Sequence, residues 1–299
     1  MTRLSRRLLL VLALLIATLA ILSAVGVTLF RGTPEWYGPS IHAASAAQRE
    51  SYAAAAENKL IETHNWAELL RADQTRAALS RQQGATTVPF PRAGATHVIE
   101  FTQDELDALL DKWSALYGWR QRYDPYLEDP RVVLRDGNLI LAGRVKDLGG
   151  AVASFHFRPR IDPQGKLHLD LVRVAGGKLP LPDAVWGKWR DTIVQSLRRQ
   201  VPQWQTEAQI DDTGSANFPA MAVTMSRLLF AATGHYAAEP VLFLPLVERG
   251  RAVPVRIAKV SVTDEKLTLV VEPLSVGQRK GFLDRIRAVE VDAPSDESR

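Results

Sequence analysis

Hydrophobic positions are densest at the start of the chain, where residues 8–30 form an apolar run without an ionisable side chain. Roughly 20 such residues make a helix long enough to cross a bilayer core of about 30 Å. Three arginines lie within residues 1–7, and Arg31 follows the run. We therefore predict a cytoplasmic tail over residues 1–7 and a transmembrane helix over residues 8–30.

A cleaved signal peptide is the alternative, because Ala24-Val25-Gly26 offers small residues that a signal peptidase accepts. The run exceeds the apolar stretch of about 7–15 residues that is typical of signal peptides, which favours an uncleaved anchor. Cytoplasmic flanks carry the excess of Lys and Arg, so the arginines place the N-terminus in the cytoplasm. We expect a single span in the inner or cytoplasmic membrane, with an extracytoplasmic C-terminal domain.

The next segment, residues 43–83, has no Gly or Pro and is rich in helix-favouring Ala, Glu, Gln and Arg. One interpretation is a rigid stalk or a partner-binding helix. The other is an amphipathic helix that rests against the domain, which the weak periodicity favours. We assign residues 31–92 to a helical stalk or linker and residues 93–291 to an extracytoplasmic domain.

A second helix begins near Thr102. Thr102 and Glu105 have the spacing of a capping box, in which each side chain accepts a hydrogen bond from a backbone N–H at the helix start. Apolar residues then recur at helical spacing: Leu106, Leu109, Leu110 and Trp113.

The middle of the chain changes to a period of two, which is typical of strands. Asp136-Gly137 separates two alternating runs and favours a two-residue turn with positive φ angles. That turn sets Leu134 opposite Leu139 and Val132 opposite Leu141. This hairpin then has one consistently apolar face.

A second hairpin follows, with a three-residue loop at residues 163–165. The register that keeps apolar residues on one face pairs Phe157 with Leu171 and Ile161 with Leu167. On the polar face the same register gives three further pairs: Arg158 with Asp170, His156 with Val172, and His168 with Arg160.

Helical patterns return around residues 185–197 and 218–232, and a last hairpin spans residues 253–271 around a turn at 263–266. Residues 292–299 form a polar tail that we expect to be disordered. Neighbouring strands joined by tight turns, with helices before and after them, predict an α+β fold. We therefore expect an antiparallel sheet packed against helices.

Charge and composition exclude several functions. The net charge is +4, but residues 1–31 hold four arginines and no acid, so the remaining chain has 33 basic and 33 acidic residues. This balance argues against nucleic-acid binding, although a local basic face remains compatible with it. The chain has no cysteine, and its histidines lack metal-ligand spacing. Without a nucleophile or phosphate motif we predict a non-enzymatic protein with no cofactor and no metal site.

Apolar helix faces are the remaining candidates for binding. Two tryptophans three residues apart and a methionine-leucine stripe are suited to lining a hydrophobic groove. Ordinary core packing against the sheet is the alternative for each stripe. The candidate ligand-lining residues are Trp186, Trp189, Met221, Met225, Leu228 and Leu229.

Three motifs in this order resemble a known family: Phe101-Thr-x-x-Glu-Leu-x-x-Leu-Leu, the hairpin from Arg131 to Gly143, and Gly177-Lys-Leu-Pro-Leu-Pro182. Together with the N-terminal anchor they are similar to YpmS-like envelope proteins and, more loosely, to tubular lipid-binding (TULIP-like) domains. The resemblance implies a long helix cradled by a curved antiparallel sheet, with an apolar groove for acyl chains. It implies no catalytic residues.

Two functional hypotheses follow. The first is a membrane-anchored domain that binds lipid or another hydrophobic ligand. The second is an envelope scaffold whose stalk helix and polar sheet face bind other proteins of the cell envelope. Both require the membrane anchor, and neither involves nucleic acid.

Overall fold

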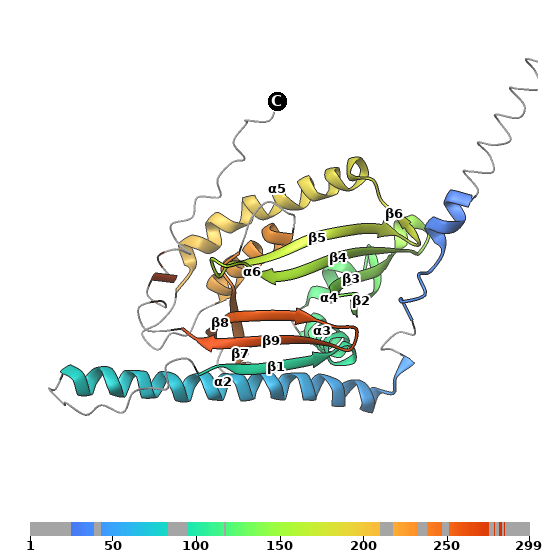
Figure 1. Ribbon diagram of the computed structural model, residues 1–299. Helices are drawn as coiled ribbons and strands as arrows, with labels where there is room; N and C mark the ends of the chain where they lie inside the picture. The colour runs from blue at the N-terminus through green and yellow to red at the C-terminus, as the bar shows by residue number, and fades with distance from the viewer. Residues whose placement is uncertain are drawn as a thin grey trace, which may run out of the picture.

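The computed structural model shows an α+β fold in which two antiparallel sheets pack with helices (Figure 1). The structure describes residues 25–38, 43–82, 95–116, 118–209, 218–232, 238–246 and 251–274, with positions 278, 281, 282 and 284.

The first sheet, sheet A, has the strand order β1-β9-β8-β7. Its strands are β1 (His97–Thr102), β7 (Val241–Leu246), β8 (Arg251–Val262) and β9 (Lys266–Pro273). The second, sheet B, has the order β2-β3-β4-β5-β6. Its strands are β2 (Leu127–Arg135), β3 (Asn138–Val145), β4 (Ala151–Ile161), β5 (Leu167–Gly176) and β6 (Leu179–Pro180).

The helices surround these sheets. They are α2 (Ala46–Gln82), α3 (Gln103–Leu116), α4 (Trp119–Tyr123), α5 (Asp183–Glu207) and α6 (Phe218–Ala232), with a 3₁₀ turn at Lys146–Leu148. Residues 25–31 are also helical. The expected α+β class and antiparallel pairing are confirmed, but the strands divide between two sheets instead of forming one. The division arises because β1, which precedes α3, pairs with the last strand, β9.

Helix α2 runs alongside sheet A and contacts all four of its strands (Figure 1). Ala56, Leu60 and Ala67 of α2 are buried against strand residues such as Ile99 and Val271. Small alanines let the helix backbone approach the sheet closely, and burying these apolar side chains supplies most of the favourable free energy. These contacts favour the interpretation of a helix resting against the domain. The end of the predicted stalk, residues 83–92, lies outside the described residues.

A row of polar contacts joins α2 to α3. Lys59 of α2 bonds both carboxylate oxygens of Glu105, at 2.6 and 2.7 Å. Lys112 of α3 bonds Glu57 at 2.8 Å, and Trp113 Nε1 donates to the same carboxylate. The capping box is confirmed, because Thr102 N–H donates to Glu105 at 2.8 Å and Glu105 N–H to Thr102 Oγ1 at 3.3 Å. Glu105 therefore accepts a hydrogen bond from a backbone N–H at the start of α3 and also forms an ion pair with α2.

The predicted turns and hairpin registers are confirmed in sheet B. Asp136 and Gly137 have φ angles of 51° and 73°, as the two-residue turn requires. The pairs Val132–Leu141 and Leu134–Leu139 form as expected, and so do Phe157–Leu171, Ile161–Leu167, Arg158–Asp170 and Arg160–His168.

One predicted pair is wrong. His156 lies opposite Arg173 instead of Val172, because a β-bulge shifts the register between His156 and Phe157. The extra residue, Val172, is left 48% exposed. The bulge brings a histidine and an arginine side by side on the polar face of sheet B.

The two sheets meet at several points. Strand β4 lies against β8, and the backbone N–H of Asp136 in the β2–β3 turn donates to Asp264 in the β8–β9 turn at 2.7 Å. A hydrogen bond therefore joins two tight turns that are 128 residues apart in sequence.

Across the part of the chain that the structure describes, no helix is both long and apolar enough to cross a membrane. Residues 8–24 of the predicted anchor lie outside the described residues, and residues 25–30 are helical. The predicted disordered tail, residues 292–299, also lies outside them.

Asp107 of α3 is a buried carboxyl group that links α3 to sheet B. It is only 5% exposed, and its Oδ1 accepts a hydrogen bond from Val132 N–H at 2.6 Å. Burial raises the pKa of Asp107 to about 7, although the Val132 N–H and Arg131 act in the opposite direction. The unfolded chain has a pKa of about 3.9 at this position. The protonated Asp107 therefore contributes to the free energy of unfolding. This contribution is fully present at low pH and is lost as the pH rises toward 7.

We expect Asp107→Asn to remove this pH dependence, because asparagine stays neutral and still accepts the Val132 hydrogen bond. Between about pH 5 and pH 7 the free energy of unfolding of the wild type should fall more steeply with pH than that of the variant. The two slopes should differ by at most about 1.4 kcal/mol per pH unit. Urea unfolding of the full chain in detergent, followed by tryptophan fluorescence, measures it. Asp73→Asn, at an exposed position, is the control. Equal pH slopes for wild type and Asp107→Asn would contradict the prediction.

Candidate anion-binding cleft

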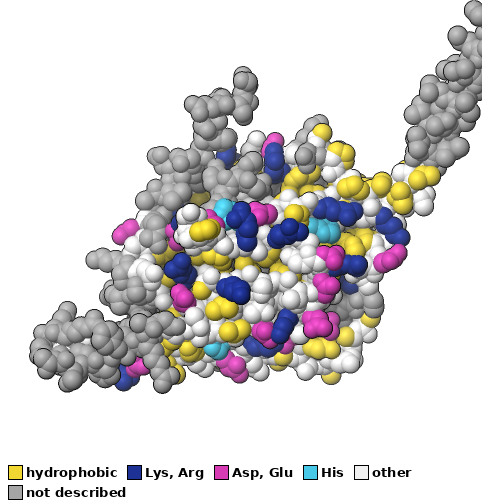
Figure 2. All heavy atoms as spheres, viewed as in Figure 1, with side chains coloured by type: hydrophobic (Ala, Val, Ile, Leu, Met, Phe, Trp, Pro, Cys, Tyr) yellow, Lys and Arg dark blue, Asp and Glu magenta, His cyan; other side chains and the backbone are white. Residues whose placement is uncertain are grey.

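Three basic or titratable side chains meet on the polar face of sheet B. His156 of β4 pairs across the strands with Ile140 of β3 and with Arg173 of β5, and Arg135 ends β2 at the adjacent turn. Because side chains two residues apart share a face, these positions project to the same side of the sheet. Seen from the side drawn in Figure 2, Lys and Arg side chains gather over the strands of this sheet.

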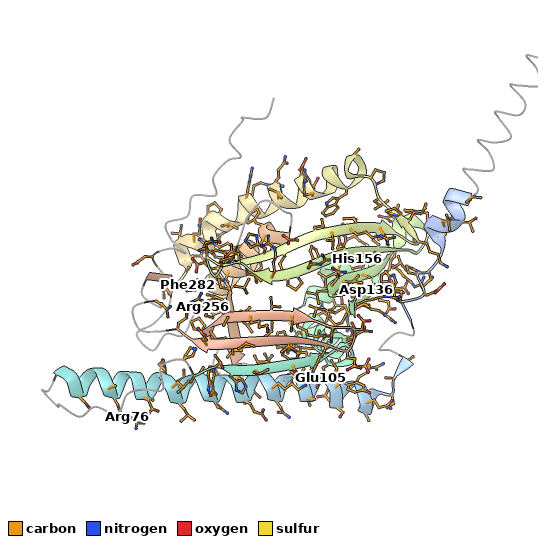
Figure 3. All side chains as sticks on the ribbon, viewed as in Figure 1. Arg76, Glu105, Asp136, His156, Arg256 and Phe282 are labelled. Carbon is orange, nitrogen blue, oxygen red and sulfur yellow. The ribbon has the colours of Figure 1, made fainter. Side chains whose placement is uncertain are left out.

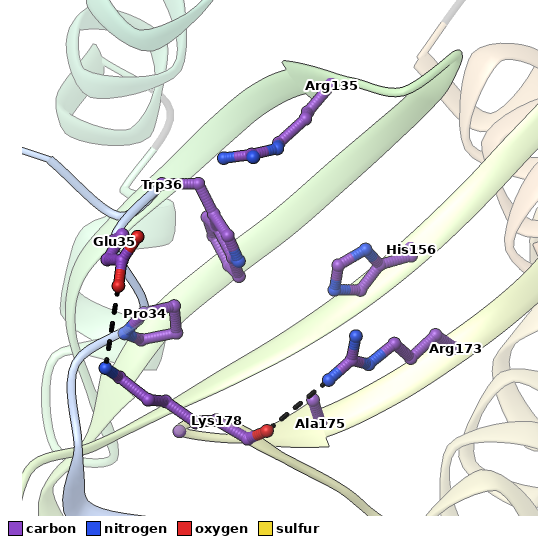
Figure 4. A pocket seen from close by; sticks show the side chains of 9 residues that line it. Pro34, Glu35, Trp36, Arg135, His156, Arg173, Ala175 and Lys178 are labelled. Atoms are coloured by element: carbon purple, nitrogen blue, oxygen red, sulfur yellow. Dashed lines mark hydrogen bonds and ion pairs between the residues drawn. The ribbon is translucent and has the colours of Figure 1, made fainter.

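Two further segments border this surface and make it a cleft. Residues 34–36 cross one side, and the turn at Gly177-Lys178 closes another. The cleft has a volume of about 210 Å³. Figure 4 shows the side chains of Arg135, Trp36, His156 and Arg173 around its open centre. The described residues that line the cleft are Pro34, Glu35, Trp36, Arg135, His156, Arg173, Ala175, Gly177 and Lys178.

The lining carries more positive than negative charge. Of the described lining residues, three are cations, Arg135, Arg173 and Lys178, and one is a carboxylate, Glu35. The Glu35 side chain is 94% exposed and lies 4.0 Å from the Lys178 ammonium. Such an exposed pair contributes little and separates easily. In the described part of the chain Arg173 has no carboxylate partner, and it donates only to the Lys178 carbonyl at 3.5 Å. Most of its guanidinium donors are therefore available to a ligand.

His156 is the central uncharged group of the cleft. It is 9% exposed, its ring lies edge-on to Trp36 with centroids 5.7 Å apart, and Ser154 Oγ lies 3.2 Å from Nε2. Burial, and then the positive charge of Arg173, lower the pKa of His156, while Asp136 raises it. A neutral imidazole has one donor and one acceptor nitrogen. His156 therefore offers a hydrogen bond at neutral pH without adding charge.

The helical residues 25–31 hold the cleft wall in place. The backbone N–H of Lys178 donates to the Leu29 carbonyl at 2.9 Å, and that of Gly177 donates to Val152 at 2.7 Å. A Cβ at Gly176 would lie 2.2 Å from the Phe30 ring, so only glycine allows this close approach. At Gly177 a Cβ would lie 2.1 Å from the Phe30 carbonyl, and its φ of +58° also favours glycine. The end of the apolar run is thus in direct contact with the cleft.

Of the six predicted ligand-lining residues, only Trp186 and Leu228 have described side chains, and neither lines this cleft. Trp186 of α5 is 8% exposed and packs on Phe155 of β4, with ring centroids 4.9 Å apart, on the apolar face of sheet B. Its contacts match the core-packing alternative. Leu228 of α6 is half-buried. The side chains of the other four candidates lie outside the described residues: Trp189, Met221, Met225 and Leu229.

Metal chemistry has no site among the described residues, where no group of three metal-ligating side chains occurs. His168 pairs with Asp162 at 2.8 Å. A second cavity, of about 140 Å³, lies between the β4–β5 turn and β8, where Gly165 and Arg256 line it. Lys166 beside it is paired with Glu239 at 2.8 Å, so its charge is already compensated.

Sequence reasoning missed the cleft for two reasons. The charge of the chain after residue 31 sums to zero, which conceals that arginines such as Arg135 and Arg173 share one face of a sheet. The other wall, residues 34–36, was assigned to the linker. The turn at Asp136-Gly137 fixes the place of Arg135 in its hairpin, but the predicted register sets Val172 opposite His156, so no signal in the sequence places Arg173 beside this histidine.

Comparisons of the chain with models of protein families, with curated proteins and with solved structures find no match in any of the three.

We expect Gly176→Ala to release residues 25–31 from the sheet, because the new methyl group overlaps the Phe30 ring. The chain has no cysteine, so spin labels at Val27→Cys and Arg158→Cys report the position of the helix relative to sheet B. Their distance distribution should be narrow in the otherwise native chain and should broaden in Gly176→Ala. Gly187→Ala is the matched control, since a Cβ there meets no atom within 4 Å. An unchanged distribution in Gly176→Ala would contradict this docking.

Proposed function

We propose that the chain is a single-pass membrane protein whose extracytoplasmic α+β body binds lipid at the membrane surface without catalysing a reaction. The apolar run over residues 8–30 and the arginines before it support the anchor and its orientation. The absence of nucleophile and phosphate motifs from the sequence supports a binding function.

The observation that carries this proposal is the docking of residues 25–31 on sheet B. A hydrogen bond joins Leu29, inside the apolar run, to Lys178 of the body. Phe30 fills the space that Gly176 leaves open. A body held this way sits directly on the membrane surface, because the last turn of the proposed span is also part of the domain.

A scaffold function has weaker support. It requires α2 to present a partner-binding surface, but the inner face of α2 is committed to sheet A. Its exposed apolar side chains include Ile61, at 44%, and Leu69, at 69%. Isolated exposed apolar residues of this kind are normal on protein surfaces.

The anchor and its orientation are tested by labelling single cysteines on intact cells with a membrane-impermeant maleimide. We expect Arg158→Cys in the body to react and Thr2→Cys to react only after lysis. The full-length protein should remain in the membrane fraction after a high-salt wash. Recovery of the intact chain in the soluble fraction, or labelling of Arg158→Cys only after lysis, would overturn the anchor and the orientation.

Lipid binding is tested separately by native mass spectrometry of the full-length protein released from detergent. We expect defined lipid adducts that survive collisional removal of the micelle. Lipids added back to delipidated protein should restore them. A protein that stays free of adducts after lipid exposure would refute lipid binding and leave the anchor intact.

A further inference from the structure

We propose that the cleft between residues 34–36 and strands β4 and β5 binds the phosphate group of an anionic membrane lipid, with Arg135, Arg173 and Lys178 as its cationic contacts. This inference rests on the proposed membrane anchor, and it names the part of the lipid that the body recognises.

The charge of the cleft selects an anion. Among the residues that the structure describes, three cations line this space, and the one carboxylate in the lining, Glu35, is almost fully exposed. Arg135 also contacts Asp136, at 3.3 Å, but the Asp136 side chain is 76% exposed and the pair is a surface one. Guanidinium groups match the oxygen atoms of a phosphate with paired N–H donors, which makes arginine the preferred residue for phosphate recognition.

The volume of the cleft suits part of a lipid headgroup and is too small for a whole lipid. Sites that enclose a drug-sized ligand have volumes of about 300–1,000 Å³. The cleft, at about 210 Å³, falls below that range. It has room for a phosphate and the first atoms attached to it, while the acyl chains would stay in the bilayer.

The position of the cleft selects the membrane as the source of the phosphate. Lys178, a cleft residue, is bonded through its N–H to Leu29 in the last turn of the proposed span. Trp36 follows Phe30 by only six positions, and a chain of that length spans at most about 20 Å. Headgroups occupy this layer just outside the hydrocarbon core, and tryptophan is enriched there.

The test uses the full-length protein in nanodiscs that contain phosphatidylcholine with about one-fifth phosphatidylglycerol. Native mass spectrometry measures the ratio of the two lipids that remain bound. We expect phosphatidylglycerol to be enriched at least about fivefold over its share of the bilayer. The double variant Arg135→Gln/Arg173→Gln should lose this enrichment.

Arg76→Gln is the matched control, because Arg76 is 77% exposed and lies far from the cleft, near one end of α2 (Figure 3). Its lipid ratio should equal that of the wild type. Lys178→Gln, which leaves the backbone hydrogen bond to Leu29 intact, is the second variant if the double variant does not fold. We expect it to lower the enrichment at least about twofold. Enrichment that survives these substitutions in a folded variant would overturn the proposal.

Free phosphate is distinguished by titrating inorganic phosphate into the wild type in pure phosphatidylcholine nanodiscs. Binding of inorganic phosphate that depends on Arg135 and Arg173, without enrichment of phosphatidylglycerol, would refute the lipid source. Enrichment that about 10 mM inorganic phosphate fails to displace supports it. Loss of lipid selectivity in a protein that still enters nanodiscs refutes the cleft proposal alone, whereas a chain that does not enter nanodiscs refutes the anchor as well.

Discussion

The hydrogen bond from the Lys178 backbone N–H to the Leu29 carbonyl is the contact on which the arrangement of this molecule depends. A backbone carbonyl near a helix end needs a partner, and here the partner belongs to the turn between β5 and β6. Phe30 packs where Gly176 and Gly177 have no side chain. This contact sets where residues 25–31 meet sheet B. Residues 34–36 are then held over the sheet by Tyr37, which is 2% exposed and donates from its hydroxyl to the Asp129 carbonyl at 2.5 Å, and so form a wall of the cleft.

Sheet B serves two purposes because side chains alternate along its strands. Phe155 faces α5, where Trp186 packs on it. His156, the next residue, faces the cleft, where Trp36 covers it. The face of Phe155 packs against α5, whereas the face of His156 carries both the cleft and a buried apolar cluster that includes Val133, Ile140 and Val152. The bulge after His156 adds to this division, because it sets Arg173 directly opposite the histidine.

Local features of the fold were predictable, and long-range ones were not. The Asp136-Gly137 turn fixes its hairpin register, since a two-residue turn and one apolar face leave a single solution. The capping box of Thr102 and Glu105 was equally predictable, because it depends only on two residue types at a fixed spacing. By contrast, the pairing of β1 with β9 and the bulge after His156 depend on contacts between distant segments, which no local pattern encodes. The cleft was missed for the same reason, because its walls come from residues 34–36 and from strands about 100 residues later.

Three cations line one cleft on sheet B, although the chain after residue 31 has no net charge. Its acidic residues compensate the cations of the whole body, but Glu35 and Asp136, which lie beside the cleft, are at exposed positions where water screens them. Burial holds the pKa of His156 below its ordinary value, so the cleft contains three positive charges instead of four near neutral pH. A fourth would increase the repulsion among cations in the empty cleft. A bound phosphate reverses that balance, because its negative charge favours the protonated imidazole. The proposed anion binding would therefore be coupled to proton uptake at His156, and acidification would strengthen it.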